Sequence, residues 1–588
     1  MKISKKIRPL LAVVATLALG MNALVASAST PKVQAGGTIT VDLNETLAGF
    51  NVNNVNSNEF VLQEIMQLVW PTVYFVNNKL ALTLNTDLVT KVAVSSKPVE
   101  TLTYTINPKA VWSDGTPITA DDFIYNWQSQ SGNPAFTDKG GAAFQPAGTT
   151  GYSSIVSVKG SNPAGGASCD AGSAADFNAG LCPNGKTVTV KFGAKTPFAD
   201  WQGLFGMIVP AHQGRLVGWN TGFNINGGGD ESTLLSGSWY YVSSYNQSAN
   251  TVVLKKNPSY WAKPGNLDSI VFAGSTDDTS GIPGIQSGTF NVFEPVSTSL
   301  AMIQQAQAAG SSVSYNVQPG LQFEHFDFNQ ANAYLKMLKV RQAIAYGTDR
   351  SELIALTVGQ AAPTTKPLNN HIYMNTQPQY KSNGNAYNHQ NIAKAKALLK
   401  STKKFKLEKD GYFHPTYGPE KGKDLSLNIS STTGNPIRSQ TEQVFQFQMK
   451  KVGIKINIVN YAAGDLFGTV IPGGRYDIAE FAWVGSPFAT GNNSIYCSYT
   501  NKADCGSNWV HFKNKTEDKL LAEGAAAANP ADEAKFYNEA DAILWKDMVT
   551  LPLYQKPIMT AWSSAYGNIL PNASSVGSTW NAQTWGLK

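Results

Sequence analysis

The feature that most constrains the fold is a strand–helix–strand unit in the second half of the chain. Residues 425–429 alternate between apolar and polar side chains, which predicts a strand with one buried face. Residues 436–452 follow with helical spacing of their apolar side chains, and Gly453 is suited to end that helix. Residues 454–458 then alternate again. Two strands joined through a helix pair in parallel with a right-handed crossover, so the pattern predicts the α/β class.

Length and composition limit the number of structural units. A typical domain has about 150 residues, so a chain of 588 residues predicts three or four units. Hydrophobic residues make up 42% and charged residues 15%, a balance that excludes an intrinsically disordered chain. The sequence has no internal repeat and no long polar linker. We therefore expect units that pack together and share chain crossings.

The N-terminus has the pattern of an export signal, predicted here as residues 1–28. A basic start is followed by an apolar run at residues 10–19 and by Ala26-Ser27-Ala28, a small-x-small cleavage motif. An uncleaved anchor is the alternative, but a spanning helix needs about 20 apolar residues and this run is shorter. We expect cleavage after Ala28. No cysteine lies near that point, so a lipid cannot be attached there.

Removal of this leader changes the charge of the chain. The sequence has 46 Lys and Arg residues against 40 Asp and Glu residues, a net charge of +6. Four of the cations belong to the leader: Lys2, Lys5, Lys6 and Arg8. Without them the excess falls to +2. Nucleic-acid binding needs clustered positive charge, so no nucleic-acid partner is expected.

Four cysteines form two local pairs, Cys169 with Cys182 and Cys497 with Cys505. Both pairs lie among Gly, Asn, Ser and Asp residues, which are typical of loops. An exported chain meets an oxidising compartment, where such pairs become disulfides. Zinc is the alternative, but neither pair has the short Cys-x-x-Cys spacing or a nearby histidine. We predict two disulfides that join loop residues.

The first half of the chain contains a strand, a turn and a capped helix in succession. Residues 102–106 alternate as a strand does, and Asp114-Gly115 predicts a turn. Thr119 followed by Asp122 has the spacing of a capping box at the start of a helix. Residues 137–185 are rich in Gly, Ala and Ser, which predicts an insertion dominated by loops.

A search for catalytic motifs finds nothing specific. No two of the six histidines have the spacing used by zinc hydrolases, and the nucleophile motif Gly-x-Ser-x-Gly is absent. Adjacent acids such as Asp121-Asp122 suit capping and turns better than acid–base chemistry, because neighbouring side chains diverge. The three glycines at 227–229 lack the remainder of a phosphate-binding motif. A binding protein without metal or organic cofactor is therefore expected rather than an enzyme.

Several stretches together resemble the family 5 extracellular solute-binding proteins, the peptide- and nickel-type receptors of ABC importers. In the order of that family they are residues 110–123 (AVWSDGTPITADDF), 236–240 (SGSWY), 254–261 (LKKNPSYW), 340–350 (VRQAIAYGTDR), 451–455 (KVGIK), 476–479 (YDIA) and 551–554 (LPLY). The resemblance runs from about Gly37 to Tyr554. Most of these motifs are structural and are not assigned to ligand binding.

The resemblance implies a two-lobed periplasmic-binding-protein-like α/β fold with an additional subdomain inserted in lobe I. The ligand then lies between the lobes and is buried by hinge closure. The implied segments are 29–80 for the start of lobe I, 81–215 for the inserted subdomain, 216–325 for the second part of lobe I, 326–548 for lobe II, and 549–588 for the return to lobe I.

The resemblance also suggests residues for the cleft. In peptide-binding members, a carboxylate three residues after a cleft tryptophan binds the peptide α-amino group. Here the matching residues are Trp483 and Ser486, so that carboxylate is missing, and Glu480 is the nearby acid that can replace it. Trp70 stands where the family often has a glutamate. Seven residues are predicted to line the cleft: Trp70, Phe323, His325, Asp327, Glu480, Trp483 and Ser486.

For three of these residues, a purely structural role is the alternative to ligand binding. Trp70 and Phe323 are equally suited to packing in an apolar core. Asp327 is suited to a buried hydrogen-bonding role at the hinge.

The function implied is an exported, monomeric receptor that captures an oligopeptide or a similar polar solute and delivers it to a membrane permease. The protein is expected in the periplasm or outside the cell. An oligosaccharide, a nickel chelate or haem are alternative ligands, because the fold does not fix the ligand. A secreted hydrolase with a carboxylate pair assembled in space, and an envelope factor without a transport role, are the alternatives from other classes.

Overall fold

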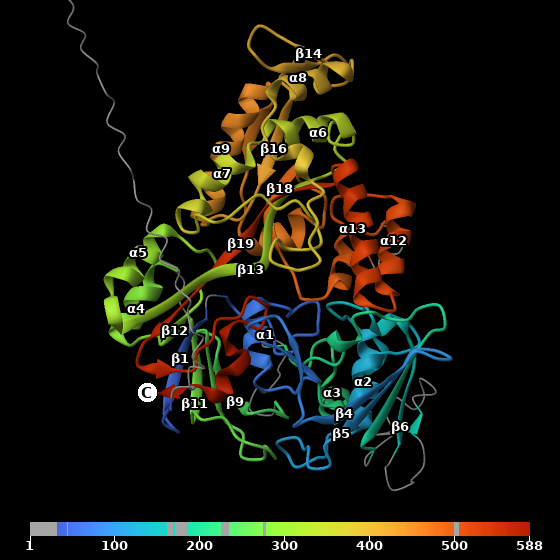
Figure 1. Ribbon diagram of the computed structural model, residues 1–588, viewed down its shortest axis with the longest axis vertical. Coiled ribbons are helices and arrows are strands. Elements are labelled where there is room, and N and C mark those ends of the chain that lie inside the picture. The colour runs from blue at the N-terminus through green and yellow to red at the C-terminus, as the bar shows by residue number, and fades with distance from the viewer. Residues whose placement is uncertain are drawn as a thin grey trace, which may run out of the picture.

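The computed structural model has the α/β architecture that the sequence predicts, with two lobes stacked along the long axis (Figure 1). It describes residues 32–43, 45–161, 169–170, 185–224, 234–274, 278–498 and 505–588. The predicted leader and the predicted disulfide between Cys169 and Cys182 lie outside the residues whose side chains are described. Among the described residues, no helix combines the length and the apolar character needed to cross a membrane.

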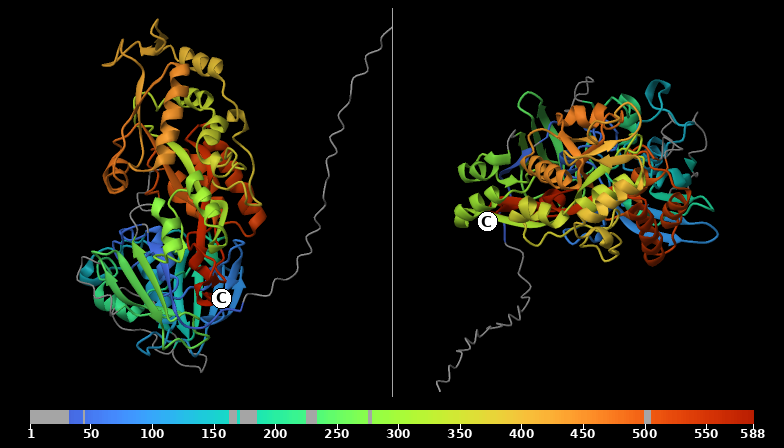
Figure 2. Two further views of the ribbon diagram at one scale, coloured as in Figure 1. Left: turned by 90° about the vertical axis from the view of Figure 1, so that its left-hand side faces the viewer. Right: turned by 90° about the horizontal axis from the view of Figure 1, so that it is seen from above.

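A single ten-stranded sheet runs through both lobes in the order β17-β16-β18-β13-β19-β12-β1-β11-β10-β9. Its strands are β1 (Thr38–Leu43), β9 (Tyr240–Asn246), β10 (Thr251–Lys256), β11 (Ser269–Gly274), β12 (Val292–Phe293), β13 (Val313–Phe328), β16 (Ser426–Ser430), β17 (Lys455–Ile458), β18 (Ile478–Val484) and β19 (Thr550–Ser563). The long antiparallel strands β13 and β19 pass from one lobe into the other, as the side view in Figure 2 shows. Their pairing shifts register after Pro319 and again after Glu324, so the ladder is irregular where the lobes meet.

Lobe II contains the strand–helix–strand unit that the sequence predicts. Strands β16 and β17 pair in parallel, from Ser426 opposite Lys455 to Ile429 opposite Ile458. The helix between them is α9 (Pro436–Val452), and Gly453 ends it in the left-handed conformation with φ of 93°. The prediction from the alternating pattern is therefore confirmed.

The two lobes have separate apolar cores. The core of lobe I draws on residues between 39 and 292 and between 569 and 585. That of lobe II draws on residues between 326 and 554. Its helices α6 (Leu338–Gly347), α7 (Arg350–Leu356), α8 (Ile392–Ser401) and α9 pack near the sheet, while α12 (Lys515–Ala525) and α13 (Pro530–Lys546) pair with each other at the side of the lobe (Figure 1).

The inserted subdomain of lobe I is built on a second sheet with the order β4-β5-β8-β6-β7. Its strands are β4 (Val89–Ser95), β5 (Thr101–Ile106), β6 (Ile155–Ser161), β7 (Cys169–Asp170) and β8 (Thr187–Phe192), and its helices are α2 (Ala120–Gln130) and α3 (Ala211–Val217). The capping box is confirmed: the Thr119 side chain accepts from the Asp121 amide, and the Thr119 amide donates to Asp122 over 2.8 Å.

Within residues 137–185, where the sequence predicts an insertion dominated by loops, the described residues also include a strand. Strand β6 lies within this stretch and pairs with β8, because Ile155 and Val158 supply buried side chains that a Gly-rich composition does not reveal. The disulfide predicted between Cys497 and Cys505 is present.

The remaining α-helices and strands are short. They are α1 (Phe60–Met66), α4 (Gly281–Ser287), α5 (Leu300–Ala308), α10 (Ala463–Asp465), α11 (Asn493–Tyr496), β2 (Tyr74–Val76), β3 (Leu82–Leu84), β14 (Phe405–Leu407), β15 (Phe413–Pro415), β20 (Tyr566–Gly567) and β21 (Gly586–Leu587).

Candidate functional site

The pairing of β13 with β18 decides which of the predicted site residues lie together. Phe323 lies opposite Trp483, and Phe326 lies opposite Glu480. Residues opposite each other share a face of the sheet, and successive residues alternate between faces. Phe323, His325, Asp327 and Trp483 therefore lie on one face, and Glu480 lies on the other.

The first face carries an aromatic cluster with a buried histidine. The His325 ring lies 4.4 Å from that of Phe481, edge to face, and is stacked at 6.1 Å on Trp483. Trp483 is in turn stacked on Trp509 at 5.0 Å. His325 is completely buried, and its Nε2 lies 3.1 Å from Oδ1 of Asp327. The sequence does not predict that Trp509 belongs to this cluster, because Trp509 is distant along the chain and lies outside any periodic segment.

Phe323 and Trp70 occupy apolar surroundings. Phe323 is buried with Leu321, Leu368 and Met374 in a small cluster close to the crossing strands. Trp70 belongs to the core of lobe I, where its Nε1 donates to the carbonyl oxygen of Leu235 over 3.2 Å. Trp70 is thus not brought together with the residues of β13 and β18, and its position fits the core-packing alternative.

Ser486 lies in the segment that follows β18, and this segment reaches lobe I. The Ser486 hydroxyl donates to the carbonyl oxygen of Phe488 over 3.1 Å, which shapes a local turn. Phe488 packs so closely on lobe I that a Cβ added at Gly203 would lie 3.0 Å from its Cε2 atom. The amide and the hydroxyl of Thr490 both donate to Asp200 of lobe I, over 3.1 and 2.8 Å. The two lobes are therefore in direct contact.

A pair of carboxyl groups lies within this contact. Asp200 of lobe I and Glu533 of α13 are within hydrogen-bonding reach of each other. Burial, and then the charge of Asp200, raise the pKa of Glu533 to about 8. Burial also raises the pKa of Asp200, although the donors on Thr490 oppose that shift. The pair therefore holds a proton at neutral pH when the lobes touch.

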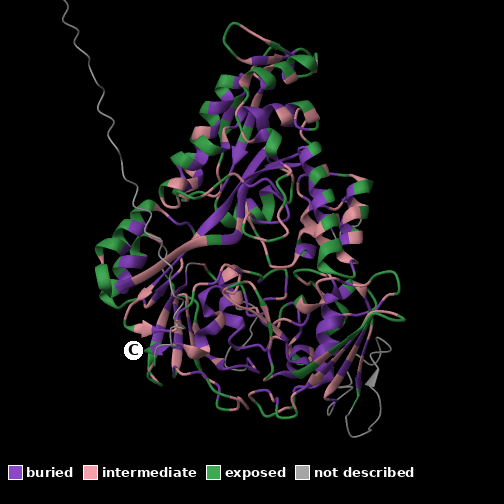
Figure 3. Ribbon diagram, viewed as in Figure 1, coloured by how far each residue is buried: buried purple, intermediate pink, exposed green. Residues whose placement is uncertain are grey.

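The second face of β13 and β18 carries a buried network of charges. Arg438, in the first turn of α9, donates to both carboxylate oxygens of Glu324 on β13, over 3.0 and 3.3 Å. Nζ of Lys556 on β19 lies 3.9 Å from the same carboxylate. Burial opposes ionisation of Glu324, but Arg438 and Lys556 outweigh it and hold its pKa below the usual range. Figure 3 shows that the strands here are largely buried.

Two further acids of this face lack full pairing. Glu480 is completely buried, and neither of its carboxylate oxygens has a hydrogen-bond partner. Burial, followed by the charge of Glu324, raises its pKa well above the usual value. Glu442 of α9 accepts from Asn460 over 2.7 Å through Oε2, while Oε1 has no partner. Burial raises the pKa of Glu442 as well.

A glutamate of lobe I also interacts with this network of charges. Glu45 follows β1 and is close enough to Lys556 for each to shift the pKa of the other, although burial raises the pKa of Glu45 overall. The N-cap residue of α9, Asn435, donates to the hydroxyl of Ser297 over 3.0 Å across the same junction. Sequence reasoning missed Glu324, Arg438, Glu442 and Lys556. Residues 323–328 contain two acids among aromatic residues, Asp327, which was predicted, and Glu324, for which the same signal was present.

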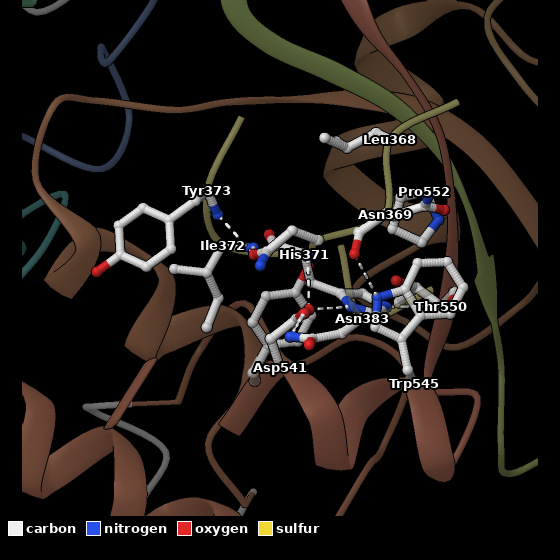
Figure 4. A network of polar contacts seen from close by, with 12 residues as sticks. Leu368, Asn369, His371, Ile372, Tyr373, Asn383, Asp541, Trp545, Thr550 and Pro552 are labelled. Atoms are coloured by element: carbon white, nitrogen blue, oxygen red, sulfur yellow. Dashed lines mark hydrogen bonds and ion pairs between the residues drawn. The ribbon is translucent and has the colours of Figure 1, made fainter. Parts of the chain in front are cut away.

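In a second buried network, around Asp541, both carboxylate oxygens have hydrogen-bond partners (Figure 4). Nδ1 of His371 and its own amide both lie 2.7 Å from Oδ1 of Asp541, and Asn383 donates to Oδ2 over 2.6 Å. Nε2 of His371 faces the carbonyl oxygen of Thr550 at 3.3 Å. Both carboxylate oxygens of Asp541 thus have hydrogen-bond partners. The second ring nitrogen of His371 faces a carbonyl oxygen and not a hydroxyl or a thiol. This histidine–aspartate pair fixes a loop of lobe II against β19 and does not activate a nucleophile.

One cluster has the composition of a metal site. Ligand atoms of Asp410, His414 and Asp424 lie within 4.8 Å of one another near the β14–β15 hairpin. His414 contacts both carboxylates, at 2.8 and 3.4 Å, and Asp424 also pairs with Lys455 at 3.0 Å. The contacts of His414 with both carboxylates, and of Lys455 with Asp424, thus account for the geometry of the cluster.

A polar depression of about 680 Å³ lies beside the crossing strands. Its lining includes Gln318 of β13, Gln555 of β19, and Asn369, Thr376 and Tyr380 from lobe II. Gln555 already donates to the carbonyl oxygen of Gly320 and to the hydroxyl of Thr376. No pattern in the sequence predicts this depression, because its lining comes from segments that only the fold brings together.

Two lobes joined by two long strands, with polar residues from both lobes at their junction, define the architecture of a periplasmic-binding-protein-like solute receptor. The family model of the bacterial extracellular solute-binding proteins, family 5, matches residues 83–504. The chain therefore belongs to the family 5 extracellular solute-binding proteins.

Comparisons with individual proteins agree with this assignment. The chain is 27% identical over 549 residues to the oligopeptide-binding protein OppA of Mycobacterium tuberculosis (strain ATCC 25618 / H37Rv), with 91% of this chain and 83% of that protein covered. Among solved structures, the periplasmic EDTA-binding protein EppA superimposes with a TM-score of 0.83 at 22% identity, over 96% of this chain and 99% of that chain. The oligopeptide-binding protein AppA from Bacillus subtilis, in complex with a nonapeptide, superimposes with a TM-score of 0.75 at 18% identity, over 95% and 100%. These superpositions support the two-lobed fold.

Proposed function

We propose that the protein is the extracytoplasmic substrate-binding component of an ABC importer that captures oligopeptides between its lobes. The observation that carries this proposal is the junction of the lobes, where Lys556 on β19 interacts electrostatically with Glu45 of lobe I and lies 3.9 Å from Glu324 on β13. A solute held there is contacted from both sides. Two similar proteins are described as oligopeptide-binding proteins, and this supports an oligopeptide as the ligand.

Capture depends on contacts that the solute makes in the closed form and not in the open form. Only the closed form contacts a solute from both lobes, so a solute that binds there shifts the equilibrium toward closure. An extended peptide can be held through its backbone, while hydrated pockets tolerate different side chains. The chain needs no bond-making step for this role. A sequence without a recognisable catalytic motif, and a His371–Asp541 pair whose hydrogen bonds are satisfied, support a receptor rather than a hydrolase.

The remaining parts of the proposal concern export and partners. The leader at residues 1–28 is cleaved after Ala28, and the mature protein acts as a monomer in the periplasm or outside the cell. It passes its solute to a permease formed by separate chains, and it does not bind nucleic acid. The lobes follow the five segments expected from the sequence after the leader, with the inserted subdomain at 81–215.

A non-peptide solute is the second candidate. The similarity to an EDTA-binding protein favours it, because a receptor of this fold can hold a compact polar molecule.

Native mass spectrometry of the purified mature protein separates the candidates. Denaturation then releases whatever the protein has retained, and its fragments are identified. A mixture of short, intact peptides supports the proposal. A single non-peptide compound supports the second candidate, and cleaved products without retained solute contradict both.

A further inference from the structure

The positive charge of this chain is concentrated in one segment of lobe II. Residues 392–424, which run from α8 through the β14–β15 hairpin, contain nine lysines and four acids. The rest of the chain after residue 28 contains 33 Lys and Arg residues and 36 Asp and Glu residues. A segment with an excess of five positive charges thus belongs to a protein whose other charges sum to a small negative value.

The fold presents the lysines of the hairpin to solvent. The hairpin lies at the end of lobe II that is farthest from lobe I, where α8 and β14 are labelled in Figure 1. Phe405 of β14 is buried, and Leu407 packs against the core of lobe II. Successive side chains of a strand point to opposite faces, so Lys406, and Lys404 just before the strand, point away from that core. Both lysines are exposed.

The end of α9 adds further positive charge at the same place. The amide of Phe413 on β15 donates to the carbonyl oxygen of Gly453 over 2.8 Å, which holds the end of α9 against the hairpin. Phe447, Lys450 and Lys451 are exposed, and their spacing places them on one outer face of the helix. We call residues 400–424 together with residues 447–455 the basic apex.

The acids of the basic apex already have partners. Each has a contact within 3.0 Å: Glu408 with Lys406, Asp410 with His414, Glu420 with Lys423, and Asp424 with Lys455. Four exposed lysines have no ion-pair partner within the part of the chain that the structure describes: Lys400, Lys403, Lys409 and Lys421. Uncompensated positive charge therefore faces solvent at the end of lobe II.

Two exposed aromatic rings lie among these lysines. Tyr417 is 39% exposed, and Nζ of Lys404 lies 4.4 Å from the centre of its ring. Phe447 is 59% exposed, and Nζ of Lys451 lies 4.4 Å from its ring centre. Aromatic rings beside lysines are typical of segments that lie at the headgroup level of a bilayer.

We propose that the basic apex is a docking surface for a bilayer that contains anionic phospholipids. The lysine ammonium groups contact the lipid phosphates, and Tyr417 and Phe447 enter the headgroup region. A projecting surface with exposed rings fits such a bilayer better than a soluble polyanion, which offers no apolar layer to the rings.

This inference goes beyond the proposed function and does not depend on the identity of the solute. The basic apex lies at the end of lobe II remote from lobe I, so docking leaves the junction of the lobes free. The contact is electrostatic and reversible, and it keeps the receptor beside the membrane in which a permease lies.

The test measures binding of the mature protein to large unilamellar vesicles by co-sedimentation. One set of vesicles contains phosphatidylcholine alone, and the other contains one third phosphatidylglycerol. We expect binding to the phosphatidylglycerol vesicles in 0.1 M NaCl and none to phosphatidylcholine. Binding should be lost in 1 M NaCl, because the Debye length falls from about 10 Å to about 3 Å.

A variant of the basic apex and a matched control separate local charge from net charge. The apex variant combines Lys400→Gln, Lys403→Gln, Lys409→Gln and Lys421→Gln. The control combines four substitutions at exposed positions of lobe I, Lys91→Gln, Lys109→Gln, Lys195→Gln and Lys255→Gln, and so has the same net charge. A lysine near an anionic bilayer strengthens binding about fivefold, so the apex variant should bind at least thirtyfold more weakly. The control should remain within threefold of the wild type, and both variants should keep the wild-type circular dichroism spectrum.

Every other outcome overturns the docking surface. Equal binding to both kinds of vesicle, or binding to neither, contradicts it. An equal loss in the apex variant and the control assigns the effect to net charge. Binding to soluble polyphosphate without binding to vesicles assigns the lysines to a soluble polyanion. Solute binding, measured separately on the same proteins, is expected to be unchanged, so its absence contradicts the proposed function and not the docking surface.

Discussion

The contact between the lobes predicts that closure depends on pH through Glu533. In the closed arrangement Asp200 and Glu533 face each other, Thr490 donates to Asp200, and the phenols of Tyr373 and Tyr537 lie nearby. No Lys, Arg or His is among the groups that shift the pKa of either acid in the described structure. Opening exposes both acids to water, where the pKa of Glu533 returns to about 4.5.

The sign and the size of the effect follow from proton linkage. The pKa of Glu533 is about 8 in the closed form, higher than in the open form, so the closed form binds the proton more tightly. The stabilisation of closure is complete below about pH 4.5 and is lost as pH rises through about 8. One proton changes the ratio of closed to open molecules by at most about tenfold per pH unit within that window.

Small-angle X-ray scattering of the mature protein without solute, from pH 5 to pH 9, measures this equilibrium. We expect the radius of gyration to rise with pH in the wild type and to be nearly constant in Glu533→Gln, which cannot ionise. Glu539→Gln, exposed on the same helix, should reproduce the wild-type curve. A flat wild-type curve, or the same rise in Glu533→Gln, refutes the argument.

Three further substitutions test the stability of the fold, each followed by urea unfolding with tryptophan fluorescence. Arg438→Ala leaves the buried Glu324 without its main partner and should lower the free energy of unfolding of lobe II by about 3–5 kcal/mol; a loss below about 1 kcal/mol contradicts the pairing. Thr119→Ala removes the capping box of α2 and should lower the free energy of unfolding by about 1 kcal/mol, whereas Thr119→Ser should be nearly neutral. The double substitution Cys497→Ser, Cys505→Ser opens a loop with a sequence separation of 8 and should lower the free energy of unfolding by about 2.5 kcal/mol; no change under oxidising conditions argues against the disulfide.

Local patterns in the sequence were sufficient to predict local structure. The alternation at residues 425–429 and 454–458 predicted two strands, and the structure pairs them in parallel around α9. Thr119 and Asp122 form the capping box that their spacing indicates. Each of these features depends on residues within one or two turns or strands, so the sequence contains all the necessary information.

The site was less predictable because it depends on register and on distant contacts. Glu480 and Trp483 are three residues apart on one strand, and the two-residue period of a strand places them on opposite faces. Glu324, Arg438 and Lys556 come from three elements that meet only after the sheet has formed. No spacing within a single segment reveals such a network. Trp70 was assigned to the cleft, although a tryptophan suits a cleft and a core equally well. In the structure it belongs to the core of lobe I.

The central claim is that the two lobes hold a solute and release it unchanged. Equilibrium dialysis of the mature protein against an isotopically labelled peptide mixture, with mass spectrometry of the bound and the free fractions, tests it most directly. The account predicts about one peptide per chain in the bound fraction, of the same mass as the peptides supplied. Shortened peptides in either fraction, or no enrichment inside the dialysis chamber for peptides or any other offered solute, would contradict it.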